Sequence, residues 1–120
     1  MTAVEVLDRS REALLRARQQ RDVVNWLEDD GRGDLQLTQT ARTLLAYMED
    51  AARLCGERAM AELALLPPGR EYGVLMRYYV LGDSLSRIAQ AMGCDVRTAT
   101  RAKSRGLKRL DNCAETEDKP

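Results

Sequence analysis

The sequence of 120 residues predicts an all-α protein. Apolar residues make up 44% of the chain but aromatic residues only 4%, and phenylalanine is absent. The core must therefore be built from Leu, Ala, Val and Met, a mixture that suits helices better than strands. Apolar residues recur at helical spacing in several segments, whereas alternation with a period of two never continues for more than a few residues. A chain of this length should form one compact domain, or one module with a helical extension.

The first predicted helix runs from about residue 4 to residue 28. Thr2 and Glu5 have the spacing of a capping box, in which each side chain accepts a hydrogen bond from the backbone N–H of the other residue. We expect Trp26, the sole tryptophan, to anchor the helix where it meets the following loop. The apolar positions follow a stripe near heptad spacing: Val4, Leu7, Leu14, Ala17, Val24 and Leu27.

Residues 29–34, with the sequence DDGRGD, should form a turn, because two glycines stand among aspartates that can cap a helix. The bunched carboxylates do not make an EF-hand calcium loop, because the alternating ligands and the glutamate at position twelve are missing. The shortness of this turn predicts that the helices on either side of it pack as an antiparallel hairpin.

A second long helix should begin between Asp34 and Thr38 and end at Leu66, because Pro67 pushes the residue before it out of helical geometry. The apolar stripes of the two helices exceed what a two-helix hairpin can bury. The surplus should face either the C-terminal module or a second copy of residues 1–66, so an intramolecular dock and a homodimer both stay open. The inward positions of the second helix are Ala41, Leu44 or Leu45, Met48, Ala52, Cys55, Ala59, Leu63 and Leu66.

A third helix is predicted over residues 68–81, with Pro68 in the first position, where its missing N–H costs nothing. Leu75, Tyr78 and Tyr79 should pack this helix across the segment that follows. Residues 84–110 have the sequence outline of a helix-turn-helix. The inward positions of its two helices are Leu85, Ile88, Ala89 and Met92, followed by Ala99, Ala102, Leu107 and Leu110.

The ends of these two helices carry recognisable signals. Ser84 can cap the first helix, Gly93 suits the left-handed residue that ends it, and Asp95 can cap the second. Residues 67–110 therefore form a predicted module, preceded by the hairpin of residues 1–66. The acidic segment 111–120 should be a flexible tail.

The net charge is zero, but basic and acidic residues are distributed unevenly along the chain. Residues 1–66 hold nine basic and twelve acidic side chains, residues 67–110 hold nine and three, and residues 111–120 hold one and four. The local charge of +6 over residues 67–110 favours nucleic-acid binding, because binding follows the local patch rather than the sum.

Double-stranded DNA is the expected partner, with the second helix of the module in the major groove. The residues expected to contact base edges are Arg97, Thr98 and Arg101. Those expected to contact phosphates are Ser84, Lys103, Arg105 and Lys108, with Thr100 and Ser104 as lesser candidates.

Residues 66–110 resemble region four of the sigma-70 family factors. The similarity lies in a Leu-Pro lead-in at Leu66-Pro67, a Leu-x-Arg-Tyr pattern at residues 75–78, and a helix-turn-helix that aligns without gaps over residues 84–110. Within the helix-turn-helix the matching positions are Ser84-Leu85, Ile88-Ala89, Met92-Gly93, Asp95 in the family's serine position, Ala99 in its valine position, Gly106-Leu107 and Leu110. Arg87 stands where the family has glutamate, and the arginines at the start of the second helix are interleaved with Thr98 and Thr100. The target sequence of the family therefore does not carry over.

The resemblance implies a DNA-binding transcription regulator, of the kind encoded by phages and prophages, that acts with RNA polymerase. Residues 1–66 leave no room for the region that contacts the −10 element, so a complete sigma factor is not expected. An alternative is an oligomeric protein-interaction or DNA-packaging adaptor of the small-terminase type, in which the hairpin of residues 1–66 would make the functional contacts.

The sequence argues against an enzyme, a metal site and a membrane span. Without histidine the usual serine and cysteine triads cannot be assembled, and no glycine-rich phosphate loop or other cofactor signature occurs. Cys55, Cys94 and Cys113 are too widely spaced for a metal site, and we expect the first two to be buried. Free thiols suit the cytoplasm, and neither a signal peptide nor a long apolar run is found.

Overall fold

The computed structural model describes the backbone of residues 1–30 and 34–118, and the side chains of residues 1–29 and 34–113. The described chain forms α1 (Ala3–Asp30), α2 (Leu35–Leu63), α3 (Arg70–Leu75), the π-helix η1 (Met76–Val80), α4 (Leu85–Met92) and α5 (Val96–Asp118). These residues include no strand, which confirms the all-α fold class. Within them, no helix combines the length and the apolar character that crossing a bilayer requires.

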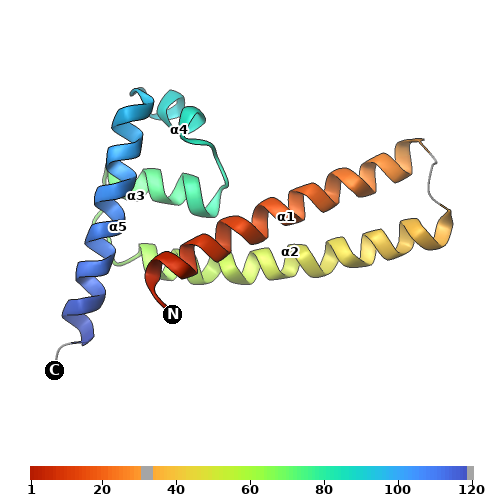
Figure 1. Cartoon of the computed structure of the whole chain (residues 1–120), viewed down its shortest axis with the longest axis horizontal. Coiled ribbons are helices and arrows are strands. Elements are labelled where there is room, and N and C mark those ends of the chain that lie inside the picture. The colour runs from red at the N-terminus through yellow and green to blue at the C-terminus, as the bar shows by residue number, and fades with distance from the viewer. Residues whose placement is uncertain (31–33, 119–120) are drawn as a thin grey trace.

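Helices α1 and α2 lie side by side and run in opposite directions, and the shorter helices gather at one end of this pair (Figure 1). The capping box at the start of α1 is confirmed, since Thr2 and Glu5 exchange hydrogen bonds of 3.2 and 3.3 Å. Asp34 caps α2 by accepting a 2.7 Å hydrogen bond from the backbone N–H of Leu37. Far from the short helices, a small apolar cluster joins the pair: Val24, Leu27, Ala41 and Leu45.

The predicted turn at residues 29–34 is described only in part. Helix α1 continues to Asp30, and the cap at Asp34 already belongs to α2. Residues 31–33, on which the turn prediction and the rejection of a calcium loop both depend, lie outside the described residues.

Two helix boundaries near the prolines differ from the predictions. Helix α2 ends at Leu63 rather than Leu66, because the chain tightens into hydrogen bonds between residues three apart before it reaches Pro67. Helix α3 begins at Arg70, with the extended residue Gly69 as its cap, so Pro68 is not its first residue. Leu66 lies outside the helix but remains buried.

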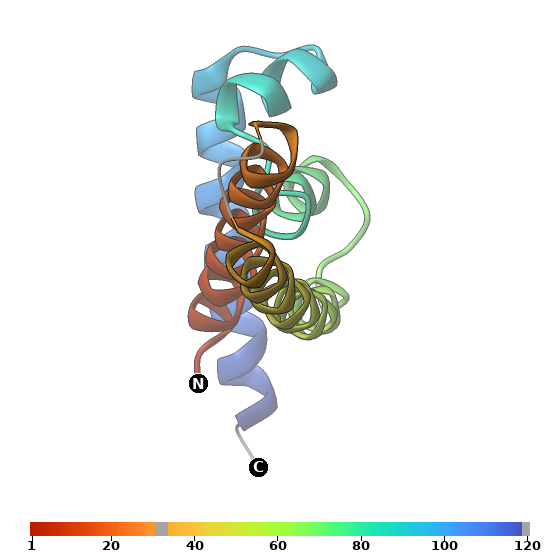
Figure 2. The same ribbon diagram turned by 90° about the vertical axis from the view of Figure 1, so that its right-hand side faces the viewer.

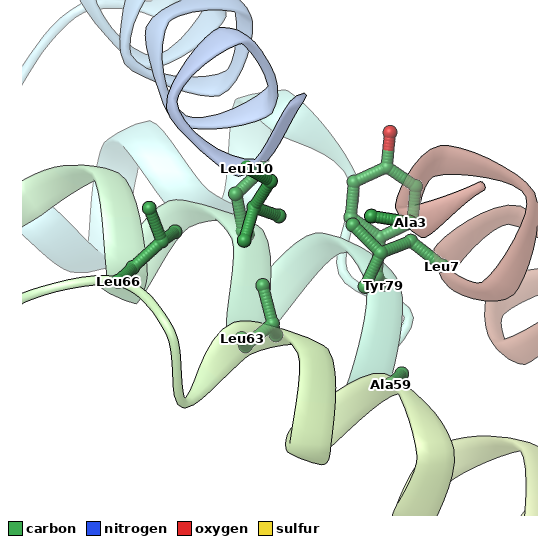
Figure 3. Close-up of a cluster of buried hydrophobic side chains, with 8 residues drawn as sticks. Ala3, Leu7, Ala59, Leu63, Leu66, Tyr79 and Leu110 are labelled. Atoms are coloured by element: carbon green, nitrogen blue, oxygen red, sulfur yellow. The ribbon is translucent and has the colours of Figure 1, made fainter. Parts of the chain in front are cut away.

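The main apolar core joins the helical pair to the rest of the chain. It receives side chains from α1, α2, the loop before α3, α3, η1 and α5 (Figure 3). The pair therefore docks intramolecularly, at its end nearest the N-terminus. The buried members of this core are Ala3, Leu7, Ala59, Leu63, Leu66, Leu75, Tyr79 and Leu110.

Polar side chains of α1 satisfy backbone oxygens at the end of η1, which have no partner within the helix. The hydroxyl of Ser10 donates to the carbonyl oxygen of Tyr79 at 3.0 Å, in a buried position. Arg11 donates to the carbonyl oxygens of Tyr78 and Asp83 at 2.6 and 3.0 Å, and its guanidinium lies 3.8 Å from the centre of the Tyr78 ring. These contacts fix the orientation of η1, and with it the start of α4.

The side chain of Trp26, which we expected to anchor the helix where it meets the loop, is half exposed. Two further expectations require correction. Cys55 of α2 and Cys94, in the turn between α4 and α5, are only partly buried rather than buried. Helix α5 continues past Leu110 to Asp118, since nothing in residues 111–118 breaks a helix.

Candidate nucleic-acid interface

Helices α4 and α5 are joined by a tight turn whose ends are capped as predicted. The Ser84 hydroxyl accepts a 3.2 Å hydrogen bond from the backbone N–H of Arg87. Gly93 ends α4 in the left-handed conformation, with φ of 68°, which a residue with a side chain rarely adopts. Asp95 accepts a 2.7 Å hydrogen bond from the backbone N–H of Thr98 at the start of α5.

The cap at Asp95 has an electrostatic consequence. The hydrogen bond from the Thr98 backbone, followed by one from its hydroxyl, holds the pKa of the Asp95 carboxyl below its usual range. The carboxylate is therefore charged at neutral pH. The Thr98 side chain is half-buried beside it.

A second apolar core fixes which face of α5 points outward. Val74 of α3 packs against buried side chains of α4 and α5. Because Ala99 and Ala102 are the inward positions of α5, the opposite side of this helix faces away from α3 and α4. The other buried members are Ile88, Ala89, Ala99 and Ala102.

The outward side of α5 carries a row of exposed residues that can bind nucleic acid. Arg97, Arg101, Ser104 and Lys108 are all exposed, and their spacing of four, three and four residues places them on one side of the helix. Figure 1 shows α5 at the edge of the molecule opposite to the free end of the α1–α2 pair, and in Figure 2 that pair stands in front of α5. Because Arg97, Arg101 and Lys108 are exposed on one side of α5, the three cations of this row are accessible together.

A hollow of about 200 Å³ lies next to this row, between α3 and α5. Its cationic lining comes from Arg70 of α3 and from Arg101 and Arg105 of α5. Glu71 also lines the hollow, but its carboxylate is paired with Arg109 at 2.9 Å. The hollow is thus lined by three arginines and is large enough for an anion such as a phosphate.

Arg70 was not among the residues proposed from the sequence. It lies 27 positions before Arg97, and only the packing of α3 against α5 brings it to this surface. Its position shortly after Leu66-Pro67 did not indicate a contact with nucleic acid, because an arginine in the first turn of a short helix is normally solvated.

Other predicted contact residues are engaged within the chain. The ammonium group of Lys103 lies 4.5 Å from the centre of the Tyr78 ring, and the side chain is half-buried on the inner side of α5. The Thr100 hydroxyl donates a 2.8 Å hydrogen bond to the backbone oxygen of Val96. Lys103 and Arg101 thus lie on different sides of α5 although they are two residues apart.

The described residues contain no group of three or more Cys, Asp or Glu side chains that could hold a metal ion. No protein family, curated protein or solved structure matches this chain. The candidate interface is therefore defined by its own geometry: a capped helix–turn–helix arrangement, an outward row of cations and a neighbouring hollow with three arginines.

Proposed function

We propose that this protein is a DNA-binding transcription regulator of the phage or prophage type, in which α4 and α5 act as a helix-turn-helix and α5 enters the major groove. The observation that carries the proposal is the exposed row of Arg97, Arg101 and Lys108 on the side of α5 opposite its buried alanines. A helix in the major groove must present side chains on one side while the other side stays packed, and this arrangement meets that requirement.

In this proposal Arg97 and Arg101 contact base edges, because they lie in the first two turns of the helix, where guanine can be bound through two hydrogen bonds. Lys108 and Arg105, further along α5, contact phosphates. Ser84 adds a phosphate contact from the start of α4: its hydroxyl accepts the capping hydrogen bond and still has a proton to donate.

Thr98 and Lys103 have smaller roles in the proposal than the sequence suggested. Both side chains are half-buried, and each already interacts with a neighbouring residue of the chain, Asp95 or Tyr78. Leaving these partners would cost part of the free energy that a DNA contact supplies. Arg70 takes the place of Lys103 as the additional phosphate ligand, because it shares the hollow with Arg105.

The similarity of residues 66–110 to sigma-70 region four supports an action together with RNA polymerase in the cytoplasm. The excess of positive charge is modest, since residues 67–110 hold nine basic and three acidic side chains. Such a surface favours weak binding to DNA alone, which a protein partner or a second copy would strengthen.

An oligomeric DNA-packaging adaptor of the small-terminase type is the second candidate. Exposed apolar side chains on α2, such as Leu44 and Leu54, favour it because they suit contacts between subunits. The oligomeric state separates the two: an assembly of ring size favours the adaptor, whereas a monomer or dimer favours the regulator.

The experiment that tests DNA binding compares two double variants with the wild type by fluorescence anisotropy on labelled DNA fragments from the gene's own locus. Arg97→Ala/Arg101→Ala should weaken binding at least about tenfold at about 50 mM salt. Arg9→Ala/Arg16→Ala removes the same number of exposed charges from α1 and should leave affinity nearly unchanged. Equal losses in both variants would show that α5 is not the binding surface.

A further inference from the structure

Helix α2 carries a row of exposed apolar side chains beside its buried face. The buried face packs against α1 and the main core through Ala41, Leu45, Ala59 and Leu63. In the exposed row, Leu37, Leu44, Tyr47 and Leu54 are between 45% and 72% exposed. We call this exposed row the α2 stripe: Leu37, Leu44, Tyr47, Ala51, Leu54 and Ala61, all exposed.

The spacing of the α2 stripe is that of a helix–helix seam. From Leu44 to Leu54 the steps are three, four and three residues, and Leu37 and Ala61 continue the pattern one heptad away on either side. The stripe spans about 36 Å along the helix. All six side chains of the stripe are exposed, so no other described segment covers them. A shallow hollow of about 380 Å³ beside Leu44 and Tyr47 leaves space for side chains of an opposing helix.

From Leu44 to Ala61 the stripe is complementary to a copy of itself that runs in the opposite direction, whereas Leu37 lies outside the paired segment. In an antiparallel seam each a position faces a d position. If Ala51 of one copy faces Leu54 of the other, Leu44 faces Ala61, so each leucine in these layers meets an alanine. A parallel pair would instead place leucine against leucine and alanine against alanine, which leaves gaps between the backbones.

Arg58, which stands at the heptad position between Leu54 and Ala61, has a counterpart in the same register. In the antiparallel arrangement it faces Tyr47 of the second copy. Asp50 stands one turn beyond Tyr47, within reach of a guanidinium group that lies over the ring. Neither Arg58 nor Asp50 forms an ion pair with another described residue.

We propose that the α2 stripe from Leu44 to Ala61 is a homodimer interface, in which two copies of this chain pair antiparallel through α2 with Ala51 facing Leu54. The partner is a second copy because one register both places Leu44 and Leu54 each against an alanine and places Arg58 over Tyr47 near Asp50. The dimer presents two α5 surfaces, although the interface itself does not depend on DNA binding.

Sedimentation analysis of the full chain, from about 1 to 100 µM, tests the proposal with a matched pair of variants. Leu54→Asp should raise the dimer dissociation constant at least about 100-fold, because two unpaired carboxylates would be buried at the seam. Leu35→Asp changes a more exposed leucine of the same helix that lies outside the stripe, and should leave dimerisation unchanged. Circular dichroism checks that both variants stay folded; if Leu54→Asp does not fold, Ala61→Lys replaces it.

The register is tested by a double-mutant cycle on dimerisation with Tyr47→Ala, Arg58→Ala and both together. If the two side chains meet across the seam, the double variant should weaken the dimer by less than the product of the single effects. Effects that simply multiply would overturn the register. The proposed interface would be overturned if the wild type stays monomeric at about 100 µM or forms a ring-sized assembly. It would also be overturned if the dimer survives Leu54→Asp or is lost with Leu35→Asp.

Discussion

Ser10 of α1 donates a buried hydrogen bond of 3.0 Å from its hydroxyl to the backbone oxygen of Tyr79 at the end of η1. The two residues are 69 positions apart in the sequence. This bond, together with those of Arg11, ties the long helical pair to the segment that leads into α4. The α4–α5 unit is thus held by the pair rather than attached to it by a free linker.

Replacing Ser10 should weaken the whole fold. Ser10→Ala leaves the Tyr79 oxygen buried without its donor, so the free energy of unfolding should fall by about 1–3 kcal/mol. Denaturation with urea, followed by circular dichroism, measures this change. Ser86→Ala, at an exposed position of α4, is the control and should change stability by no more than about 0.5 kcal/mol. An equal effect of both substitutions would contradict the assigned role of Ser10.

Gly106 lies at a close approach of α5 to α3. A Cβ atom at this position would lie 2.7 Å from Cδ1 of Leu75, which is fully buried and has no room to move. Gly106→Ala should therefore cost about 1–3 kcal/mol of overpacking, offset by about 1 kcal/mol of helix propensity. Gly69→Ala, which meets nothing within 4 Å, is the matched control. Thermal unfolding of the two variants should show a lower midpoint for Gly106→Ala only, and a stabilised Gly106→Ala would contradict the packing.

Tyr79 should make the fold sensitive to alkaline pH. Burial, with smaller contributions from Asp8 and Tyr78, raises the pKa of Tyr79 from its ordinary value of 10.0 to about 12. The unfolded chain then loses this proton at lower pH than the folded chain, so stability is full below pH 10 and falls as the pH rises toward 12. The free energy of unfolding of Tyr79→Phe should depend less on pH in this range. Tyr47→Phe, at an exposed position, should behave as the wild type does.

Much of the local structure could be predicted from the sequence, because it depends on neighbours along the chain. The caps at Thr2, Ser84 and Asp95, the left-handed Gly93, and the inward alanines of α5 all follow from short patterns. The periodicity of apolar residues likewise indicated which faces of α1 and α2 are buried.

The features that could not be predicted arise from contacts between distant segments. The π-helical turns at Met76–Val80 accompany the docking of α1, whose Ser10 and Arg11 bind the carbonyl groups at its end. Lys103 turns inward because Tyr78 lies beneath it, and Arg70 joins the candidate interface because α3 packs on α5. The intramolecular dock of the helical pair also depended on this packing, because the periodicity of apolar residues does not indicate which partner covers them.

The central claim is that the outward side of α5 contacts DNA bases with Arg101 and phosphates with Lys108. The most direct test measures binding of Arg101→Ala and Lys108→Ala to a locus fragment and to random DNA over a range of salt concentrations. Arg101→Ala should remove about 1–3 kcal/mol of the preference for the locus fragment. Lys108→Ala should weaken binding to both DNAs alike and reduce the slope of log K against log salt by about 0.9. Equal losses on random DNA for both variants, or no binding by the wild type at about 50 mM salt, would contradict the claim.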